Sequence, residues 1–254
     1  MTLLVSGTAS ICALDISKAF DKVNHHALLL KLMDRLVPIE LLNLFESWLS
    51  NCFSFVKWKS SWSGCFNLNF GVRQGSVLAP LLIAVYINDI SELFRFQHGV
   101  HVVLYADDIM LVTSSVSVLQ KALKVCQREL ENPDMALNAK KTCCLRIGRR
   151  ASVSCASIVT LNGIALQWSD ELRYLGVHIV RFSRFKISLD KPKRSFYRAA
   201  KSVFGKVVRV ASEEVTIQLF NNKCVPVLLY ALETCSLSKS DLSSIDFTFN
   251  RFFL

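Results

Sequence analysis

The sequence contains no Cys-x-x-Cys pair, although nine of its 254 residues are cysteine. Zinc sites in small domains are normally built on such pairs, and an odd number of cysteines does not fit a complete disulfide framework. The adjacent histidines His25 and His26 do not form a metal site by themselves. The cysteines therefore indicate buried, reduced thiols in an intracellular protein of the nucleus or cytoplasm.

The chain also lacks a long hydrophobic run, an internal repeat and a glycine-serine linker. Its longest apolar stretch, from Val77 to Ile87, is too short to cross a bilayer, so we expect no membrane partner. The first fourteen residues are mildly apolar but carry no basic segment, which argues against a signal peptide. Without a linker, the chain is expected to fold as one continuous unit.

Acidic residues are scarce and unevenly placed. The formal charge is +10, with eight basic and nine acidic side chains in residues 1–110 but 22 basic and 11 acidic ones in residues 111–254. Residues 181–209 hold ten basic residues and one acid. A basic amphipathic helix of this kind can coat a membrane surface or follow a nucleic-acid backbone. Four of its cations recur at helical spacing: Lys191, Arg194, Arg198 and Lys201.

Two adjacent acids, Asp107 and Asp108, interrupt an otherwise apolar β-hairpin predicted over residues 100–113. Neighbouring carboxylates repel each other, and burial would raise their pKa values unless a cation or hydrogen bonds compensate. A solvated Asp-Asp turn is the more common use of such a pair in an arbitrary chain. By itself the pair is therefore weak evidence for a metal site.

A third acid, Asp15, ends an apolar strand predicted over residues 10–14. The two strands are expected to lie side by side, so that the three acids share one divalent ion site of the kind used in phosphoryl transfer. Between them, Gly71–Ser76 forms a glycine-bracketed loop before a predicted helix. Glycines let the backbone approach a ligand, and a helix amino terminus favours an anion.

Five segments, in this order and spacing, resemble the motifs of a reverse transcriptase, an RNA-directed DNA polymerase, of the kind encoded by non-LTR (LINE-like) retrotransposons. The similarity covers residues 9–180. The segments are Leu14–Asp21, Gly71–Pro80 (a GxxQGSxLxPLL motif), Tyr105–Asp108 ([FY]ADD), Leu137–Thr142 (LNxxKT) and Tyr174–Val177 (YLG).

The resemblance implies an α+β fold. Residues 1–180 would form a palm, an antiparallel sheet packed on helices, with partial fingers, and residues 181–254 a basic helical thumb. The fingers are expected to be largely missing, because only fourteen residues precede Asp15. The apolar end at residues 252–254 indicates a truncated thumb, cut within a larger retrotransposon polyprotein.

The implied activity is template-dependent addition of deoxynucleotides to a primer 3′-OH by two-metal-ion catalysis. The cofactor would be Mg²⁺, with Mn²⁺ as a substitute, held by Asp15 and Asp107, the Ile16 carbonyl and the more peripheral Asp108. Lys141 would protonate the leaving pyrophosphate, with Lys140 as a rival one position away. The implied partners are an RNA template, a DNA or RNA–DNA primer duplex and dNTPs.

Further residues take roles from the resemblance alone. Phe20 is the aromatic that would exclude a ribose 2′-hydroxyl, Arg73 could reach a phosphate, and Gln74 and Gly75 would contact the base pair being formed. The primer grip would consist of Tyr174, Leu175 and Gly176, and the four helical cations would contact the nucleic-acid backbone.

Two alternatives remain open. One is a catalytically inactive remnant that at most binds nucleic acid through its basic thumb. The other is an RNA-directed RNA polymerase, disfavoured by Phe20 and by alanine at position 106.

The sequence predicts helices and strands in the following ranges: helices 25–36, 38–50, 77–94 and 115–131, a thumb of helices, and strands 52–59, 63–70, 142–147, 157–161, 164–168 and 174–180.

Overall fold

The computed structural model describes residues 7–95, 97–131, 135–207 and 210–253, apart from the side chains of residues 252 and 253. The chain divides into two compact units, Met1–Ser169 and Asp170–Leu254. The division falls before the YLG segment, which the sequence analysis places in the first domain. The apolar end at residues 252–254 and Arg209 of the basic segment lie outside the described side chains.

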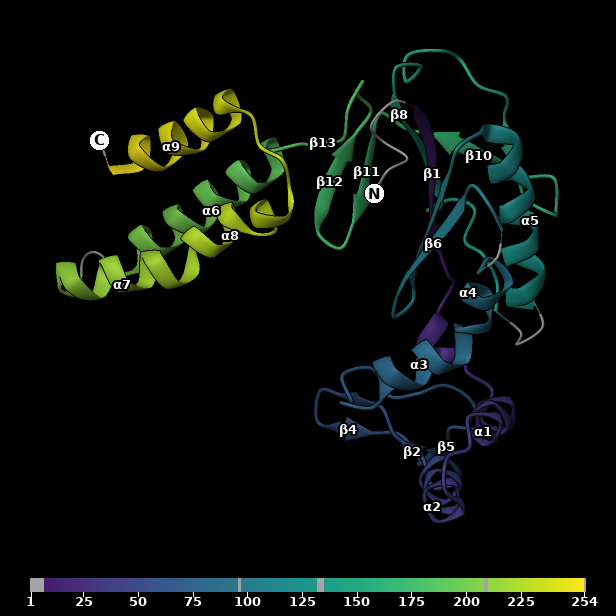
Figure 1. Ribbon diagram of the computed structural model, residues 1–254. Coiled ribbons are helices and arrows are strands. Elements are labelled where there is room, and N and C mark those ends of the chain that lie inside the picture. Colours follow the sequence, from purple (N-terminus) through teal and green to yellow (C-terminus); the bar gives the residue numbers. More distant parts are fainter. Residues whose placement is uncertain (1–6, 96, 132–134, 208–209, 254) are drawn as a thin grey trace. The chain divides into compact units, whose positions relative to one another are not determined.

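The first unit is built on a six-stranded sheet (Figure 1). All its pairings are antiparallel except the one between β10 and β8. The mainly antiparallel sheet with helices packed on it agrees with the α+β expectation. In spatial order the strands are β6 (Val100–Tyr105), β7 (Asp108–Thr113), β1 (Thr8–Asp15), β8 (Cys143–Gly148), β10 (Ala165–Trp168) and β9 (Ile158–Val159).

Helix α5 (Val116–Glu131) packs against this sheet, as Figure 1 shows. Its apolar residues recur every three or four positions, so that one stripe is buried in the core. Leu119, Leu123 and Leu130 are among its fully buried side chains. The other helical segments of the unit are η2 (Ala19–Asp21), α1 (His25–Asp34), α2 (Ile39–Ser50), α3 (Ala79–Ile87) and α4 (Asp89–Leu93).

The long helix predicted over residues 77–94 is wrong in two details. It begins only at Ala79, where Pro80 is pre-set for a first turn and the Ser76 hydroxyl accepts the Ala79 N–H at 3.1 Å. It is also interrupted at Asn88, between α3 and α4. There the Ser91 hydroxyl and N–H both donate to the Asn88 carbonyl, at 2.7 and 2.8 Å, which replaces the regular helical hydrogen bond with a tighter turn.

The strands predicted over residues 52–59 and 63–70 are realised only as two short pairs. Strands β2 (Phe53–Ser54) and β5 (Phe66–Asn67) form one, and β3 (Lys57–Trp58) and β4 (Ser61–Trp62) form the other. Almost every side chain between residues 53 and 67 is exposed. Without a buried face to hold it, a longer ladder gains little stability.

The second unit combines a small sheet with a helical layer. Its buried cluster includes Phe196, Phe220 and Leu228, and the rings of the two phenylalanines pack edge to face with their centroids 5.6 Å apart. The predicted strand 174–180 is a hairpin instead, because Leu175 and Gly176 turn the chain with positive φ angles of 47° and 79°. The elements are β11 (Glu171–Tyr174), β12 (Val177–Val180), β13 (Lys186–Ile187), α6 (Asp190–Val207), α7 (Glu213–Lys223), α8 (Val225–Leu229), η3 (Leu232–Thr234) and α9 (Lys239–Phe253).

Helix α6 is amphipathic as predicted. Phe196 and Ala200 are buried in the second unit's core, while all four cations of the predicted stripe are exposed. Among the described residues, no helix combines the length and the apolar character that a membrane crossing would require.

All nine cysteines lie in the described part of the chain, and each is a free thiol. Five are buried, including Cys126 on α5, whereas Cys65 is exposed. Burial raises the pKa of the Cys126 thiol from its ordinary value of 9.0 to about 12, and the nearby charge of Glu129 adds to the shift. A thiolate at this position would be strongly disfavoured in the folded protein.

The Cys126 thiol should make the folded state sensitive to alkaline pH. Because its folded pKa lies above its unfolded pKa, its contribution to stability is complete below pH 9 and is lost as the pH rises towards 12. At pH 10.5 the loss should amount to about 2 kcal/mol of unfolding free energy. Urea unfolding at pH 8 and pH 10.5 would measure it. The fall should be smaller in Cys126→Ala, and an equal fall in both proteins would contradict the assignment.

Candidate active site

The strand register brings the three predicted acids to one end of the six-stranded sheet. Strand β1 pairs with β7 so that Asp15 lies opposite Asp108, and β6 pairs with β7 so that Tyr105 also lies opposite Asp108. Ala106 and Asp107 form the hairpin turn, with Ala106 in a left-handed conformation (φ 51°). The expectation that these two strands lie side by side is therefore confirmed.

A cavity of about 520 Å³ opens beside this end of the sheet. Six of the predicted site residues line it, whereas the exposed Asp108, Arg73 and Gly75 and the neighbouring Lys140 do not. The six are Asp15, Ile16, Phe20, Gln74, Asp107 and Lys141.

Within this cavity, the Lys141 ammonium lies 3.9 Å from the Asp15 carboxylate. The lysine side chain is 70 % exposed, so the ion pair contributes little to stability. The Lys141 side chain therefore remains free to move toward a charged ligand in the cavity. The Asp15 backbone is held in place separately, because its N–H donates to the Thr142 hydroxyl at 3.2 Å.

On the edge away from β7, the backbone beside Asp15 is hydrogen-bonded to the segment that follows α5. The Ser17 N–H donates to the Ala136 carbonyl and the Asn138 N–H donates to the Asp15 carbonyl, both at 2.8 Å. Because carbonyls along an extended chain alternate in direction, the Ile16 carbonyl points to the opposite edge, where β7 and the Asp107 turn lie. That direction suits the ligand role predicted for it.

The donor set of the cavity consists of oxygen atoms. Two carboxylates, from Asp15 and Asp107, line it together with the Ile16 backbone. Across the described ranges of the chain, no group of three or more His, Cys, Asp or Glu side chains is arranged to hold a metal ion. Mg²⁺ needs few protein ligands, because it retains water and also binds substrate phosphates, so this set fits it.

The loop Gly71–Ser76 is tied to the Phe20 segment by backbone hydrogen bonds. The Val72 N–H donates to the Phe20 carbonyl at 2.7 Å, and the Gly71 N–H donates to the Val23 carbonyl at 2.8 Å. A ring nitrogen of His25 lies 2.8 Å from the Gly71 carbonyl. Sequence reasoning assigned His25 no role, and only the fold shows that it helps to hold this loop.

Gly71 is the position where this loop tolerates no side chain. Its φ is +86°, and an added Cβ would lie 2.9 Å from the Phe20 carbonyl oxygen and 3.0 Å from the Asp21 Cα. We expect Gly71→Ala to lower the unfolding free energy by about 1–3 kcal/mol. Urea unfolding would measure this loss. Gly64→Ala is the matched control, since nothing lies within 4 Å of its added Cβ; equal losses in both variants would contradict the close approach.

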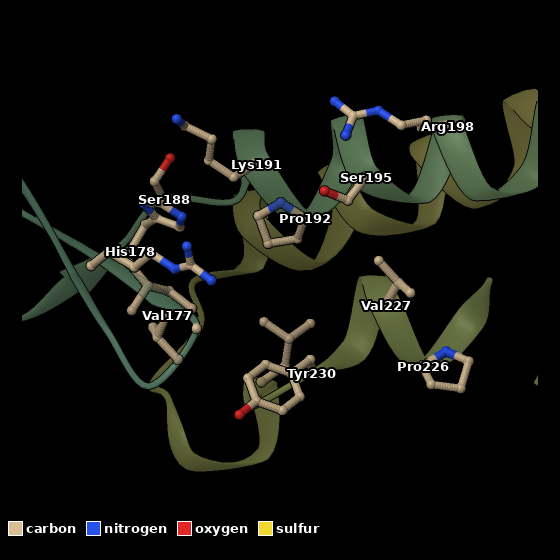
Figure 2. A pocket seen from close by; sticks show the side chains of 14 residues that line it. Val177, His178, Ser188, Lys191, Pro192, Ser195, Arg198, Pro226, Val227 and Tyr230 are labelled. Carbon is tan, nitrogen blue, oxygen red and sulfur yellow. The ribbon is translucent and has the colours of Figure 1, made fainter. Parts of the chain in front are cut away.

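The second unit contains its own cavity, of about 660 Å³, with cations at its border (Figure 2). Figure 2 shows Lys191 and Arg198 on α6, across the cavity from Pro226 and Val227 on α8. The Tyr230 hydroxyl donates to the Leu175 carbonyl at 3.1 Å, which fastens the YLG turn to the segment after α8.

Only part of the predicted nucleic-acid-binding set lines this second cavity. Gly176, Lys191 and Arg198 line it, whereas the buried Tyr174 and the exposed Arg194 and Lys201 do not. Sequence reasoning missed Arg173 and His178, which also line the cavity and are register partners across the β11–β12 hairpin. Arg173 could have been identified from the sequence, because it is the strand neighbour of Tyr174 and neighbouring side chains in a strand point to opposite faces.

Comparison with known proteins identifies the family. The family model for reverse transcriptase (RNA-dependent DNA polymerase) matches residues 4–179. The RNA-directed DNA polymerase from mobile element jockey of Drosophila melanogaster is 29 % identical over 254 residues, covering 91 % of this chain and 26 % of the relative. Its counterpart in Drosophila funebris is 32 % identical over 203 residues, covering 74 % of this chain and 21 % of the relative.

Solved structures agree at the level of the fold. Telomerase from Candida albicans, in complex with a fragment of telomeric RNA, has a TM-score of 0.56 at 12 % identity and covers 98 % of this chain and 49 % of its own. Apo telomerase from Candida tropicalis, truncated from its C-terminal domain, has a TM-score of 0.55 at 15 % identity and covers 72 % and 36 %. The chain spans about a quarter of the length of the jockey relatives. It belongs to the reverse transcriptase (RNA-dependent DNA polymerase) family and is similar to the enzymes of non-LTR mobile elements.

Proposed function

We propose that this chain supplies the catalytic centre for RNA-directed DNA synthesis, the template-dependent addition of deoxynucleotides to a primer 3′-OH. The observation that carries the proposal is the single cavity that unites Asp15 and Asp107 with Phe20 and Gln74. This cavity is large enough for a nucleotide. The two carboxylates would bind the metal ions, the Phe20 ring would contact the sugar, and the Gln74 amide would contact the base pair.

Asp15, Asp107 and the Ile16 carbonyl would hold two Mg²⁺ ions, which when bound stabilise the charge on the attacking 3′ oxygen and on the leaving pyrophosphate. Asp108 stands outside the cavity and would act from the periphery. Lys141 would donate a proton to the pyrophosphate, because its ammonium lies on the cavity wall within 3.9 Å of Asp15.

The six-stranded sheet and its helices would serve as the palm, and the second unit as the thumb. The support is that the sheet carries the catalytic acids, while α6 exposes its cations and keeps its apolar face in the core. The turn of Leu175 and Gly176, held by Tyr230, would grip the primer. The nine free thiols support an intracellular location in the nucleus or cytoplasm.

Primer extension tests the proposal. The purified chain would be given an RNA template, a DNA primer, dNTPs and MgCl₂, and the products resolved by length. Metal-dependent extension supports the polymerase, and EDTA should abolish it. Salt-sensitive binding of the primer–template with no extension would support the remaining rival, an inactive remnant that only binds nucleic acid.

Removal of two α6 cations should weaken duplex binding. Lys191 and Arg198 are exposed and line the second cavity, so each is placed to neutralise one phosphate. The slope of log K against log [salt] is negative, and we expect the variant with Lys191→Gln and Arg198→Gln to make it less steep by roughly 1.8, or about 0.9 for each contact. Binding titrations on an RNA–DNA duplex from low to moderate salt would measure it.

Lys223→Gln on α7 is the matched control, because this lysine is also exposed but lies outside the cavity. Its slope should stay within about half a unit of the wild-type slope. If the double variant kept the wild-type slope, these two cations would have no part in backbone binding.

A further inference from the structure

Residues 51–70 of the first unit form an exposed aromatic surface that the proposed chemistry does not use. The segment contains six aromatic residues and two lysines, with no acidic, arginine or histidine residue. In Figure 1 its strands lie beside α3, apart from the six-stranded sheet of the same unit. All six aromatic side chains are at least 46 % exposed: Phe53, Phe55, Trp58, Trp62, Phe66 and Phe70.

The tip of this surface is the β3–β4 hairpin, which presents one tryptophan on each face. Lys57 lies opposite Trp62 in the register, and Trp58 lies opposite Ser61. Because directly paired residues share a face and neighbours alternate, Trp58 and Trp62 project from opposite faces. Trp58 is 75 % exposed and Trp62 is 57 % exposed.

The face that carries Trp62 already pairs an aromatic ring with a cation. The Lys57 ammonium lies 4.8 Å from the centre of the Trp62 ring, and the Phe55 ring packs edge-on against Trp62 at 5.0 Å. Phe55 packs against the indole and Lys57 places a positive charge over the ring, yet Trp62 remains more than half exposed. Aromatic faces flanked by cations are the common device for binding unpaired bases and their phosphates.

We propose that the β3–β4 hairpin binds single-stranded nucleic acid by stacking unpaired bases on Trp58 and Trp62. Charge selects this occupant, because a surface with lysines and no acids complements phosphates, whereas an apolar protein partner has no need of that bias. The inference rests on the proposed function in one respect: the strand would be the template that has yet to be copied.

Chain connectivity supports that role. Trp62 ends β4, and twelve residues later Gln74 lines the catalytic cavity. Twelve extended residues span at most about 43 Å, so the hairpin and the cavity lie within reach of one bound strand of about a dozen nucleotides. The connection is also fixed, since the Leu68 N–H donates to the Cys52 carbonyl at 2.7 Å and Phe70 bridges to Asn24.

Equilibrium binding of an unstructured RNA of about 12 nucleotides, beside a duplex of the same sequence, tests the proposal. We expect Trp58→Ala and Trp62→Ala each to weaken binding of the single strand by roughly 5- to 150-fold, with little change for the duplex. Trp62→Phe should retain most of the affinity, because a phenyl ring still offers a stacking face. Thermal unfolding would verify that the variants remain folded.

Phe247→Ala provides the matched control. Phe247 is a 62 % exposed ring on α9 with the Arg251 guanidinium 5.8 Å from its centre, so it repeats the aromatic–cation pair outside the hairpin. Its substitution should leave the affinity for the single strand unchanged.

Three results would overturn the inference. The first is unchanged affinity for the single strand in both tryptophan-to-alanine variants. The second is an equal loss of affinity for the duplex. The third is that the wild-type chain self-associates and the variants do not, which would indicate that the hairpin is a protein interface. The proposed catalysis fails separately. Asp107→Asn should bind the single strand like the wild type while losing extension, and a wild-type chain that binds through the tryptophans but never extends would refute only the polymerase proposal.

Discussion

Asp107→Asn is expected to reduce primer extension by at least about a thousandfold, with little effect on folding. The asparagine keeps the shape of the side chain but removes the charge that would hold the metal ions. Loss of about 4 kcal/mol of transition-state stabilisation corresponds to that factor. Asp107 is half-buried at a hairpin turn, so the backbone hydrogen bonds of β6 and β7 do not depend on its carboxylate. Single-turnover extension with saturating dNTP would measure the effect.

Asp21→Asn is the matched control for the acid. Asp21 is exposed in the 3₁₀ segment η2, close in sequence to Asp15, but it does not line the catalytic cavity. Its variant should extend the primer at close to the wild-type rate. A comparable loss in both variants would mean that general charge, rather than the ion site, governs activity. Full activity in Asp107→Asn would show that Asp107 is not part of the catalytic centre.

Phe20→Ala is expected to lower the preference for deoxyribonucleotides over ribonucleotides by roughly 10- to 100-fold. The Phe20 ring is half-buried against the core and lines the cavity, and its backbone is fixed by the Val72 N–H. A ring in this position can fill the space that a 2′-hydroxyl would need. Steric exclusion of one small group changes the activation free energy by about 1–3 kcal/mol, which corresponds to the expected change in preference. The ratio of kcat/KM for dNTP and rNTP incorporation would measure it.

Phe45→Ala on α2 is the control that distinguishes a change in sugar discrimination from a loss of core packing. Phe45 is another half-buried phenylalanine packed against the same core, but it lies outside the cavity. Both variants should lose some stability, whereas only Phe20→Ala should change the sugar preference. Unchanged discrimination in Phe20→Ala would disprove the role of Phe20 as a barrier to ribonucleotides.

Much of the fold could be predicted because its patterns are local. The apolar periodicity of α5 and α6 and the apolar strands that end in acids are set by neighbours a few residues apart. The helix over residues 77–94 and the strand over residues 174–180 were wrong where single turns override the pattern. At Asn88 side-chain and backbone hydrogen bonds break the helix, and at Leu175 and Gly176 positive φ angles reverse the strand.

The sequence alone determined the family motifs, the three acids at the ends of predicted strands and the amphipathic character of α6, because each depends on residue type and short spacing. Only the tertiary structure decided which residues share a cavity. It joined the Asp15 N–H to the hydroxyl of a threonine 127 residues away, placed Lys141 but not Lys140 in the cavity lining, left Asp108 outside it, and added Arg173 and His178 to the second unit's cavity. The physical reason is that strand register and loop anchoring depend on long-range pairing, which short-range sequence patterns do not encode.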